Sequence, residues 1–546
     1  MALIPVENVG ETGIVKDINP WQLPPNVWSD GNNVRVEHGA IVKSPGYAEV
    51  LATCPVTPYH IIQLKYGAAV YWVIASLEKI YVHNGTVWTN ITRQTLGSDV
   101  DYHATADEGW TSTVLGGVLV MANGLDQPQF WALVNGVPPV TLGVPTTKMD
   151  NLTAWAAGAG ATHYPVSVRA FRSFLIALNL TEAGTPIPQK VKWSTEAGTQ
   201  AVPASWDESS AIVDAGEYEL ADTKGAILDG LPLGDTFMIY KDDSIYSMTY
   251  VGTPFIFAFR QLSPSVGALA KNCVAEYDGG HFFLGNGDVY INDGQRIKSI
   301  LPHKIRDYIF GVIDGANFER SFVVADYGNT EMWACFPTPE SSTNQCDKAV
   351  VWNWTNNAFT IRDIPDLAHI GYGTVDDPNA FTTWAAAVPT WSSALGTWTQ
   401  TWSQSENVLV MASPTDTKLY RNASGNREDD TDMTSFIART GMAITAQQQN
   451  DQSTVKRIKA IWPKMEVSGS GNTVNVYVGT QNSTEEAVSW SSAVAFNPDT
   501  QSKVSVRKSG KLYGVKFEST GDFNWRLDGY EIELDDAGRR GSRMST

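Results

Sequence analysis

Short apolar runs separated by turn residues make up most of this chain, and helical periodicity is almost absent. Between residues 60 and 92 four such runs follow one another, and Asn84-Gly85 separates the last two: HIIQLKYG, AAVYWVIAS, KIYVHNG and TVWTNIT. Asn-Gly is a strong hairpin signal because both residues accept the positive φ of a type I′ turn. Four meandering strands in this short stretch predict a unit of the size of one propeller blade.

The same strand-and-turn unit recurs along the chain. Comparable runs lie around 110–136, 168–194, 226–260, 271–301, 320–364 and 406–424. The repeat is degenerate, and counting it yields roughly six or seven units, within the usual range for propellers. The pattern therefore predicts an all-β fold with a β-propeller of six to seven degenerate blades. A chain of β-sandwiches is the alternative explanation of the same pattern.

One segment, LPHKIRDYIFGVI at 301–313, has helical spacing, with Ile305, Ile309 and Phe310 on one face.

The stretch 380–403 also departs from the strand-and-turn pattern, and in it Thr-Trp pairs recur at Trp384, Trp391 and Trp398. Its proline, glycine, Ser and Thr content disfavours a helix. We expect short hairpins there, with the tryptophans packing on an outer edge; a sugar- or partner-binding platform is the alternative.

The pattern of apolar and polar residues changes after about residue 430. The acidic stretch REDDTD at 427–432 is followed by strands with clear period-2 alternation, as in Val474-Val476-Val478. This pattern predicts a small β-sandwich and a division of the chain into three parts. Residues 1–50 form an N-terminal arm and hairpin, 51–430 the propeller, and 431–546 a C-terminal sandwich or platform with a basic tail. The two terminal parts are expected to form the platform together.

Charge and cysteine content narrow the functional classes. The net charge is −19, which argues against a basic face that grips nucleic acid, because such binding relies on Lys and Arg neutralising phosphates. A negative wall would instead let nucleic acid slide past. The four cysteines are too few for a disulfide framework, and Cys335 and Cys346, the pair that a hairpin could bring together, are expected to be free thiols. The N-terminus lacks a signal-peptide pattern, and no apolar run approaches the ~20 residues of a membrane helix.

No catalytic constellation is visible in the sequence. It contains no G-x-S-x-G, H-E-x-x-H, P-loop or C-x-x-C pattern, and its eight His residues are scattered. Asp278, Asp288 and Asp293 lie in turn contexts, which explain them without calcium. We expect no enzymatic activity, no cofactor and no metal site. A propeller that binds glycans or degrades polysaccharide is the alternative, and it would need paired carboxylates in a central cleft.

The most specific stretch lies at the start, where GIVKDINPWQLPPNVWSDGNNVRVEHGAIVKSPGY spans residues 13–47. It resembles the N-terminal signature of tail-nozzle proteins (tail-hub or tail tubular protein B-like) of short-tailed bacteriophages. The later islands FRSFLIALN, KVKWS, SWDE and FNWRLDGYEIELDDAGRR resemble family segments in the same order. The residues that match the opening pattern are Gly13, Asp17, Pro20, Leu23, Pro24, Pro25, Trp28, Ser29, Asp30, Asn33, Val34, Arg35, Gly39, Pro45, Gly46 and Tyr47.

The resemblance implies a structural protein of the virion tail, assembled in the host cytoplasm. Family members form a homohexameric ring below the adaptor of the head–tail connector and continue the DNA channel. Viral DNA passes through without specific binding. Tail fibres or tailspikes attach around the ring, and a needle or plug closes it. The resemblance also implies a propeller with a platform that holds both chain ends.

The opening segment has the physical character of a docking element. Its prolines hold an extended backbone at low entropic cost, and Trp21 and Trp28 are anchors that can insert into another surface. Residues 34–47 are predicted to form a hairpin with Gly39 near its turn. Whether the segment docks on its own subunit or on a neighbour stays open. The candidate assembly contacts are Trp21, Trp28, Arg35, Tyr47, Arg539, Arg540 and Arg543.

Overall fold

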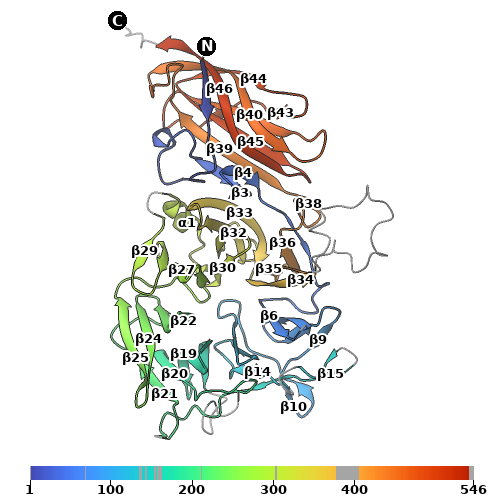
Figure 1. Ribbon diagram of the computed structural model, residues 1–546, viewed down its shortest axis with the longest axis vertical. Helices are drawn as coiled ribbons and strands as arrows, with labels where there is room; N and C mark the ends of the chain where they lie inside the picture. The colour runs from blue at the N-terminus through green and yellow to red at the C-terminus, as the bar shows by residue number, and fades with distance from the viewer. Residues whose placement is uncertain are drawn as a thin grey trace.

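The computed structural model describes residues 2–539 except residues 68 and 211 and the segments 134–137, 142–143, 153–154, 156–162, 302–303 and 377–404. The chain forms a ring of seven antiparallel sheets with a two-sheet sandwich beside it (Figure 1). The ring uses the middle of the chain, and the sandwich uses both of its ends. The predicted all-β propeller with a sandwich of terminal segments is therefore confirmed.

The first three blades contain four strands each. Blade 1 consists of β6 (His60–Tyr66), β7 (Ala69–Ala75), β8 (Ile80–His83) and β9 (Trp88–Asn90). Blade 2 consists of β12 (Thr111–Leu115), β13 (Val118–Ala122), β14 (Gln129–Trp131) and β17 (Met149–Asn151). Blade 3 consists of β18 (Tyr164–Phe171), β19 (Phe174–Glu182), β20 (Thr185–Trp193) and β21 (Gly216–Glu219). Two small hairpins project from this region: β10 (Gln94–Thr95) with β11 (Ser98–Asp99), and β15 (Val140–Thr141) with β16 (Val144–Pro145).

The next three blades repeat the pattern. Blade 4 consists of β22 (Ile227–Leu233), β23 (Thr236–Lys241), β24 (Ile245–Gly252) and β25 (Ile256–Ser263). Blade 5 consists of β26 (Val274–Tyr277), β27 (Gly280–Leu284), β28 (Val289–Asn292) and β29 (Ile297–Ser299). Blade 6 consists of β30 (Phe322–Asp326), β31 (Glu331–Phe336), β32 (Cys346–Asn353) and β33 (Ala358–Leu367).

Blade 7 closes the ring with a strand from the other end of the chain. It consists of β34 (His369–Asp376), β35 (Ser405–Ser413), β36 (Lys418–Asn422) and β5 (Tyr47–Glu49), and it carries the short extra strands β37 (Arg427–Glu428) and β38 (Thr431–Asp432). The first strands of successive blades contact one another from β12 round to β34, and β34 contacts β6. These first strands therefore surround the propeller axis.

The sandwich is woven from both termini. One sheet contains β1 (Ala2–Val6), β3 (Val34–Glu37), β4 (Ala40–Lys43), β40 (Thr454–Val467), β44 (Val504–Gly510) and β46 (Trp525–Arg539). The other contains β2 (Asp30–Asn32), β39 (Thr434–Met442), β41 (Val474–Gln481), β42 (Ser489–Trp490), β43 (Val494–Phe496) and β45 (Leu512–Thr520). Val36 pairs with Ile41 across the predicted hairpin, and His38-Gly39 makes its turn with positive φ at both residues.

Second strands such as β13 and β27 are buried throughout rather than on alternate residues, and His281 is the one polar side chain in the two. Every residue of β13 and of β27 is buried, because a blade is covered on both faces by its neighbours. The largest core cluster reaches beyond the propeller. It joins Phe282 and Met332 of blades 5 and 6 to Trp28 and Tyr530 of the sandwich.

Among the described residues, helical structure is confined to short pieces between strands. The segment with helical spacing contains α1 (Arg306–Val312), which buries Ile309, and two 3-10 turns lie at Pro20–Gln22 (η1) and Phe318–Arg320 (η3). Cys335 and Cys346 are free and buried, as the sequence analysis expected. The Thr-Trp repeat at 380–403 lies outside the described residues.

Candidate functional site

The opening segment is built into the sandwich of its own chain. Trp28 is only 1% exposed, donates its indole N–H to the Val9 carbonyl at 2.7 Å, and packs against the rings of Phe517 and Tyr530 at 6.5 and 6.0 Å. A buried Trp with its N–H satisfied contributes its full apolar area to the core. In this chain, Trp28 is therefore an internal anchor and does not reach out toward a neighbouring copy.

A buried arginine holds the proline-rich part of the segment. Arg439 on β39 is 1% exposed and donates to the carbonyls of Pro20 (2.9 Å), Leu23 (2.6 Å) and Pro24 (3.2 Å). The Pro20 and Pro24 carbonyls also accept backbone N–H groups within the segment, from Leu23 at 3.3 Å and Val27 at 3.1 Å, whereas Arg439 is the donor to the Leu23 carbonyl. The planar fork of a guanidinium can serve several acceptors at once. Burial lowers the pKa of Arg439 to about 10, which leaves it charged at neutral pH.

The backbone of the opening segment also packs closely against the end of β39. Gly441 lies two residues after Arg439. Its φ is +72°, and a Cβ there would lie 2.9 Å from the Trp21 backbone nitrogen. Beneath the segment, Val15, Leu23 and Val27 form a small apolar cluster. Sequence reasoning missed Arg439, because nothing local marks an arginine in a strand as the partner of carbonyls more than 400 residues away.

The other expected assembly contacts lie in different places. Trp21 sits half-buried on η1, at the surface of the segment. Arg35 lies on β3 at the joint between sandwich and propeller, and Tyr47 lies in blade 7, where its ring contacts Tyr420 at 5.0 Å. Arg539 is the last residue of β46, and Arg540 and Arg543 lie outside the described residues. The structure thus divides these residues among the sandwich, the joint and the propeller.

The propeller axis contains a buried ion pair. Arg169 of blade 3 contacts Asp229 of blade 4 at 2.6 Å, and the Asp229 side chain is fully buried. Asp229 also accepts hydrogen bonds from the Ser167 hydroxyl (2.9 Å) and the Asn272 backbone N–H (3.3 Å). Burial alone would raise the pKa of Asp229, but the Arg169 charge and these hydrogen bonds outweigh it and hold the pKa below its ordinary value. Asp229 is therefore an ionised group that ties blades together.

Further contacts cross the axis on the side where the first strands begin. Arg320, ahead of blade 6, pairs with Asp107, ahead of blade 2, at 2.7 Å. Lys271, ahead of blade 5, lies 3.8 Å from Glu108 of the same blade 2 loop. Burial lowers the pKa of Lys271 to about 8. Blade 2 stands opposite blades 5 and 6 in a seven-bladed ring, so these side chains close the propeller's own axis at this end.

Two histidines meet where the ring closes. His60 of blade 1 and His369 of blade 7 have ring centroids 4.1 Å apart, and His60 shares a 2.8 Å hydrogen bond with the Ser112 hydroxyl. Burial and the Arg169 charge lower the pKa of His369 to about 4. Burial and the neighbouring His369 lower that of His60 as well. Both rings are neutral at neutral pH and act as packed polar groups at the closure.

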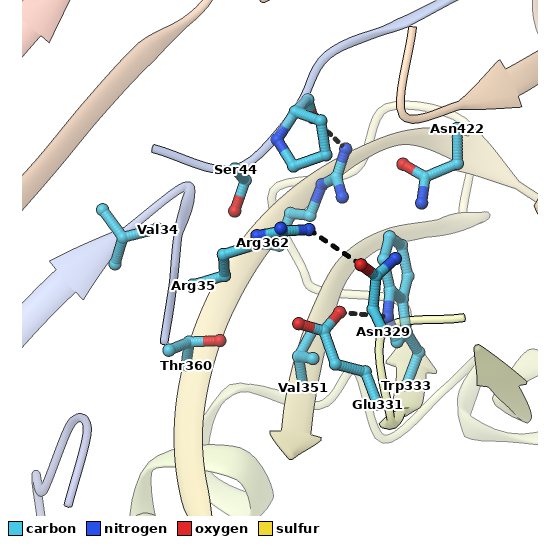
Figure 2. A pocket seen from close by; sticks show the side chains of 11 residues that line it. Val34, Arg35, Ser44, Asn329, Glu331, Trp333, Val351, Thr360, Arg362 and Asn422 are labelled. Carbon is cyan, nitrogen blue, oxygen red and sulfur yellow. Dashed lines mark hydrogen bonds between the residues drawn. The ribbon is translucent and has the colours of Figure 1, made fainter. Parts of the chain in front are cut away.

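A small polar cavity of about 10 Å³ lies between the sandwich and the propeller (Figure 2). Arg35 approaches it from the sandwich, and Glu331 and Arg362 approach it from blade 6. The volume corresponds to about one water molecule. The remaining lining residues are Val34, Ser44, Pro45, Asn329, Trp333, Val351, Thr360 and Asn422.

Among the described residues, no group of three or more His, Cys, Asp or Glu side chains is arranged to hold a metal ion. Asp278, Asp288 and Asp293 lie in three separate turns of blade 5. Among the described helices, none has the length and apolar character needed to span a bilayer.

Comparisons with known proteins found likenesses among solved structures only. No protein-family model and no curated protein matches the sequence. Solved structures with similar folds include PorZ of the type-IX secretion system of Porphyromonas gingivalis (8% identity, 83% of this chain and 59% of PorZ, TM-score 0.36). An ancestral GH74 enzyme (11%, 74% and 51%, 0.38) and AztD from Citrobacter koseri (11%, 78% and 95%, 0.33) are also similar. The chain spans about three fifths of PorZ, and likenesses at these identities carry no functional argument.

Proposed function

We propose that this chain is a structural virion protein, the tail nozzle or hub of a short-tailed bacteriophage. The observation that carries the proposal is the opening segment. Its many matches to the nozzle signature include Trp28, Pro20 and Leu23, the residues that the sandwich core and Arg439 bind. In this proposal the signature encodes a rigid platform on which a ring is assembled.

The proposed assembly is a homohexamer below the adaptor ring, with tail fibres or tailspikes around it and a needle or plug at its end. Viral DNA passes along the ring without specific binding. The cross-axis pairs Arg320–Asp107 and Lys271–Glu108 obstruct the axis within each propeller. A conduit is therefore expected between copies of the chain and not through a single propeller.

The charge of the chain suits such a conduit. Each copy carries a formal net charge of −19, so a ring of copies concentrates negative charge. A negative wall repels phosphates and prevents the strong, salt-dependent adhesion that Lys and Arg clusters produce. A basic channel wall in an experimental map of the assembled ring would contradict this part of the proposal.

Mass measurement tests the central claim. The purified protein, alone and mixed with a head–tail adaptor complex, is expected to form hexamers or adaptor-bound rings by native mass spectrometry. Trp21→Ala removes a half-exposed aromatic from the segment surface and is expected to weaken ring formation, since interface tryptophans often contribute about 2 kcal/mol or more.

Tyr218→Ala is the matched control, because Tyr218 is 47% exposed on β21, at the end of the propeller away from the sandwich (Figure 1). Equal effects of the two variants on ring formation would show that the opening segment is not part of the assembly surface. A stable monomer that degrades polysaccharide, and loses that activity when one buried carboxylate is changed, would overturn the proposal in favour of a propeller hydrolase.

A further inference from the structure

The joint between sandwich and propeller contains a carboxyl group in an unusual position. Glu331 begins β31 of blade 6, is 6% exposed, and lines the small cavity that also borders the sandwich strand β3 (Figure 2). Its carboxyl accepts one hydrogen bond, from the Trp333 indole N–H at 3.3 Å. Among the described residues, no Lys, Arg or His nitrogen comes within 4.0 Å of it. An ionised carboxylate buried in this way lacks the pairing that normally accompanies burial.

Two arginines border the same cavity, but each is engaged elsewhere. Arg35 donates to the Asn329 side chain at 3.0 Å and pairs with Glu37 on its own strand. Arg362 donates to the Pro45 carbonyl at 2.6 Å and lies over the Trp333 ring, 4.7 Å from its centroid. Both cations therefore attract Glu331 across the cavity without neutralising it.

The charges around Glu331 come from every element at the joint. Burial and Asp326 on β30 raise the pKa of Glu331 to about 7, although Arg35, Arg362 and the Trp333 hydrogen bond oppose them. Asp326 already accepts two backbone N–H groups and the Asn329 amide, so it stays in place. Behind the two arginines lie Glu37, which pairs with Arg35, and Glu428, whose charge acts on Arg362 without an ion pair.

One polar atom at the cavity also has no partner. The Asn422 side chain is 2% exposed, and its oxygen has no hydrogen-bond partner among the described residues. The closed joint thus leaves a carboxyl with one weak hydrogen bond and an unpaired amide oxygen around a space for about one water. Local opening that admits water would hydrate both groups.

We propose that Glu331 makes the joint between sandwich and propeller pH-sensitive: the closed joint holds the neutral carboxyl, and loss of its proton opens the joint locally at Arg35. By linkage, any arrangement that hydrates the carboxylate has a lower pKa for Glu331 and gains population as the pH rises. The opening is a sub-global motion of the β3–β4 hairpin against blade 6. This inference does not depend on the function proposed above.

Hydrogen exchange of the full chain tests the proposal. Peptides covering residues 34–43 are followed between pH 6 and pH 8.5, and rates are corrected for intrinsic chemical exchange. In the wild type the corrected exchange of this hairpin is expected to rise about tenfold over the range, since ionisation of one group can shift an equilibrium tenfold per pH unit above its closed-state pKa. In Glu331→Gln, which keeps the shape and stays neutral, the corrected rate is expected to be constant.

Glu340→Gln is the matched control, because Glu340 is an exposed carboxyl in the turn after β31 of the same blade. It is expected to keep the wild-type pH dependence. A flat wild-type profile overturns the proposal without any variant. Greater protection of the hairpin at high pH, or a pH dependence retained in Glu331→Gln, also overturns it.

Discussion

Arg439 illustrates how one residue determines the shape of a segment far away in sequence. Its three hydrogen bonds to Pro20, Leu23 and Pro24 satisfy carbonyls that the fold covers. We predict that Arg439→Lys lowers the free energy of unfolding by about 2 kcal/mol, because an ammonium group cannot keep all three hydrogen bonds and the Leu23 carbonyl depends on Arg439 as its donor. Urea denaturation measures the loss.

The control for Arg439→Lys is Arg260→Lys, since Arg260 is exposed on β25. It is expected to change stability by less than about 0.5 kcal/mol. Hydrogen exchange should accelerate at residues 19–27 in the Arg439 variant alone. Similar stability of the two variants would show that the hydrogen bonds from Arg439 to the Pro20, Leu23 and Pro24 carbonyls do not stabilise the fold.

His369 contributes to the acid sensitivity of the propeller closure, together with His60. Its pKa is lowered to about 4 in the fold, against about 6.5 in an unfolded chain. Between these values the unfolded state binds the proton more tightly, so the stability that neutral His369 contributes is present above pH 6.5 and is lost as the pH falls through 4. The loss is expected to amount to about 3 kcal/mol.

His369→Gln should therefore make the acid side of the stability curve less steep between pH 6.5 and 4, as measured by denaturation at each pH. His38→Gln provides the comparison, because the His38 side chain is 84% exposed. That variant is expected to follow the wild-type curve. Parallel wild-type and His369→Gln curves would mean that other groups cause the acid destabilisation.

Among the elements, the short strand β5 closes the propeller although it contains few residues. Tyr47–Glu49 completes blade 7 by pairing with β36, and Gly46 just before it passes so close to β37 that a Cβ would lie 2.0 Å from the Arg427 carbonyl oxygen. We predict that Gly46→Ala destabilises the chain by about 3 kcal/mol, since backbone on both sides must shift. Gly39→Ala is the control: its φ is +78°, but nothing lies within 4 Å.

The Gly39 variant is expected to cost about 1 kcal/mol, through its backbone conformation alone. Denaturation compares the two variants, and hydrogen exchange of residues 418–422 should increase only in Gly46→Ala. Equal costs for both glycines would mean that the closure tolerates displacement of β5.

The same strand shows why some elements were predictable and others were not. The hairpin at Asn84-Gly85 follows from residues adjacent in sequence, because turn chemistry and alternation are local. The pairing of Tyr47 with Asn422 has no such signal, since any strand of suitable pattern could fill that edge. The sequence analysis therefore placed Tyr47 in the N-terminal arm, whereas it belongs to the propeller. The axial pair Arg169–Asp229 was missed for the same reason: its members lie in different blades.

At the scale of the whole molecule, one apolar core joins the two parts. Phe282 and Met332 of the propeller belong to the same buried cluster as Trp28 and Tyr530 of the sandwich. Domains joined by polar, water-accessible contacts tend to move and unfold separately, whereas a large shared apolar core couples them. The local opening proposed at Glu331 is compatible with this coupling, since sub-global motions need less free energy than unfolding.

We therefore predict a single cooperative unfolding transition for propeller and sandwich, with calorimetric and van't Hoff enthalpies in agreement. Trp28→Phe, in the shared core, and Leu119→Ala, in the separate core between blades 1 and 2, should each shift that one transition to lower temperature. The two sites lie in different parts of the molecule, so a shared shift can arise only if the parts unfold together. Two resolved transitions, with Trp28→Phe moving one and Leu119→Ala moving the other, would show that the apolar contact between the parts does not couple their unfolding.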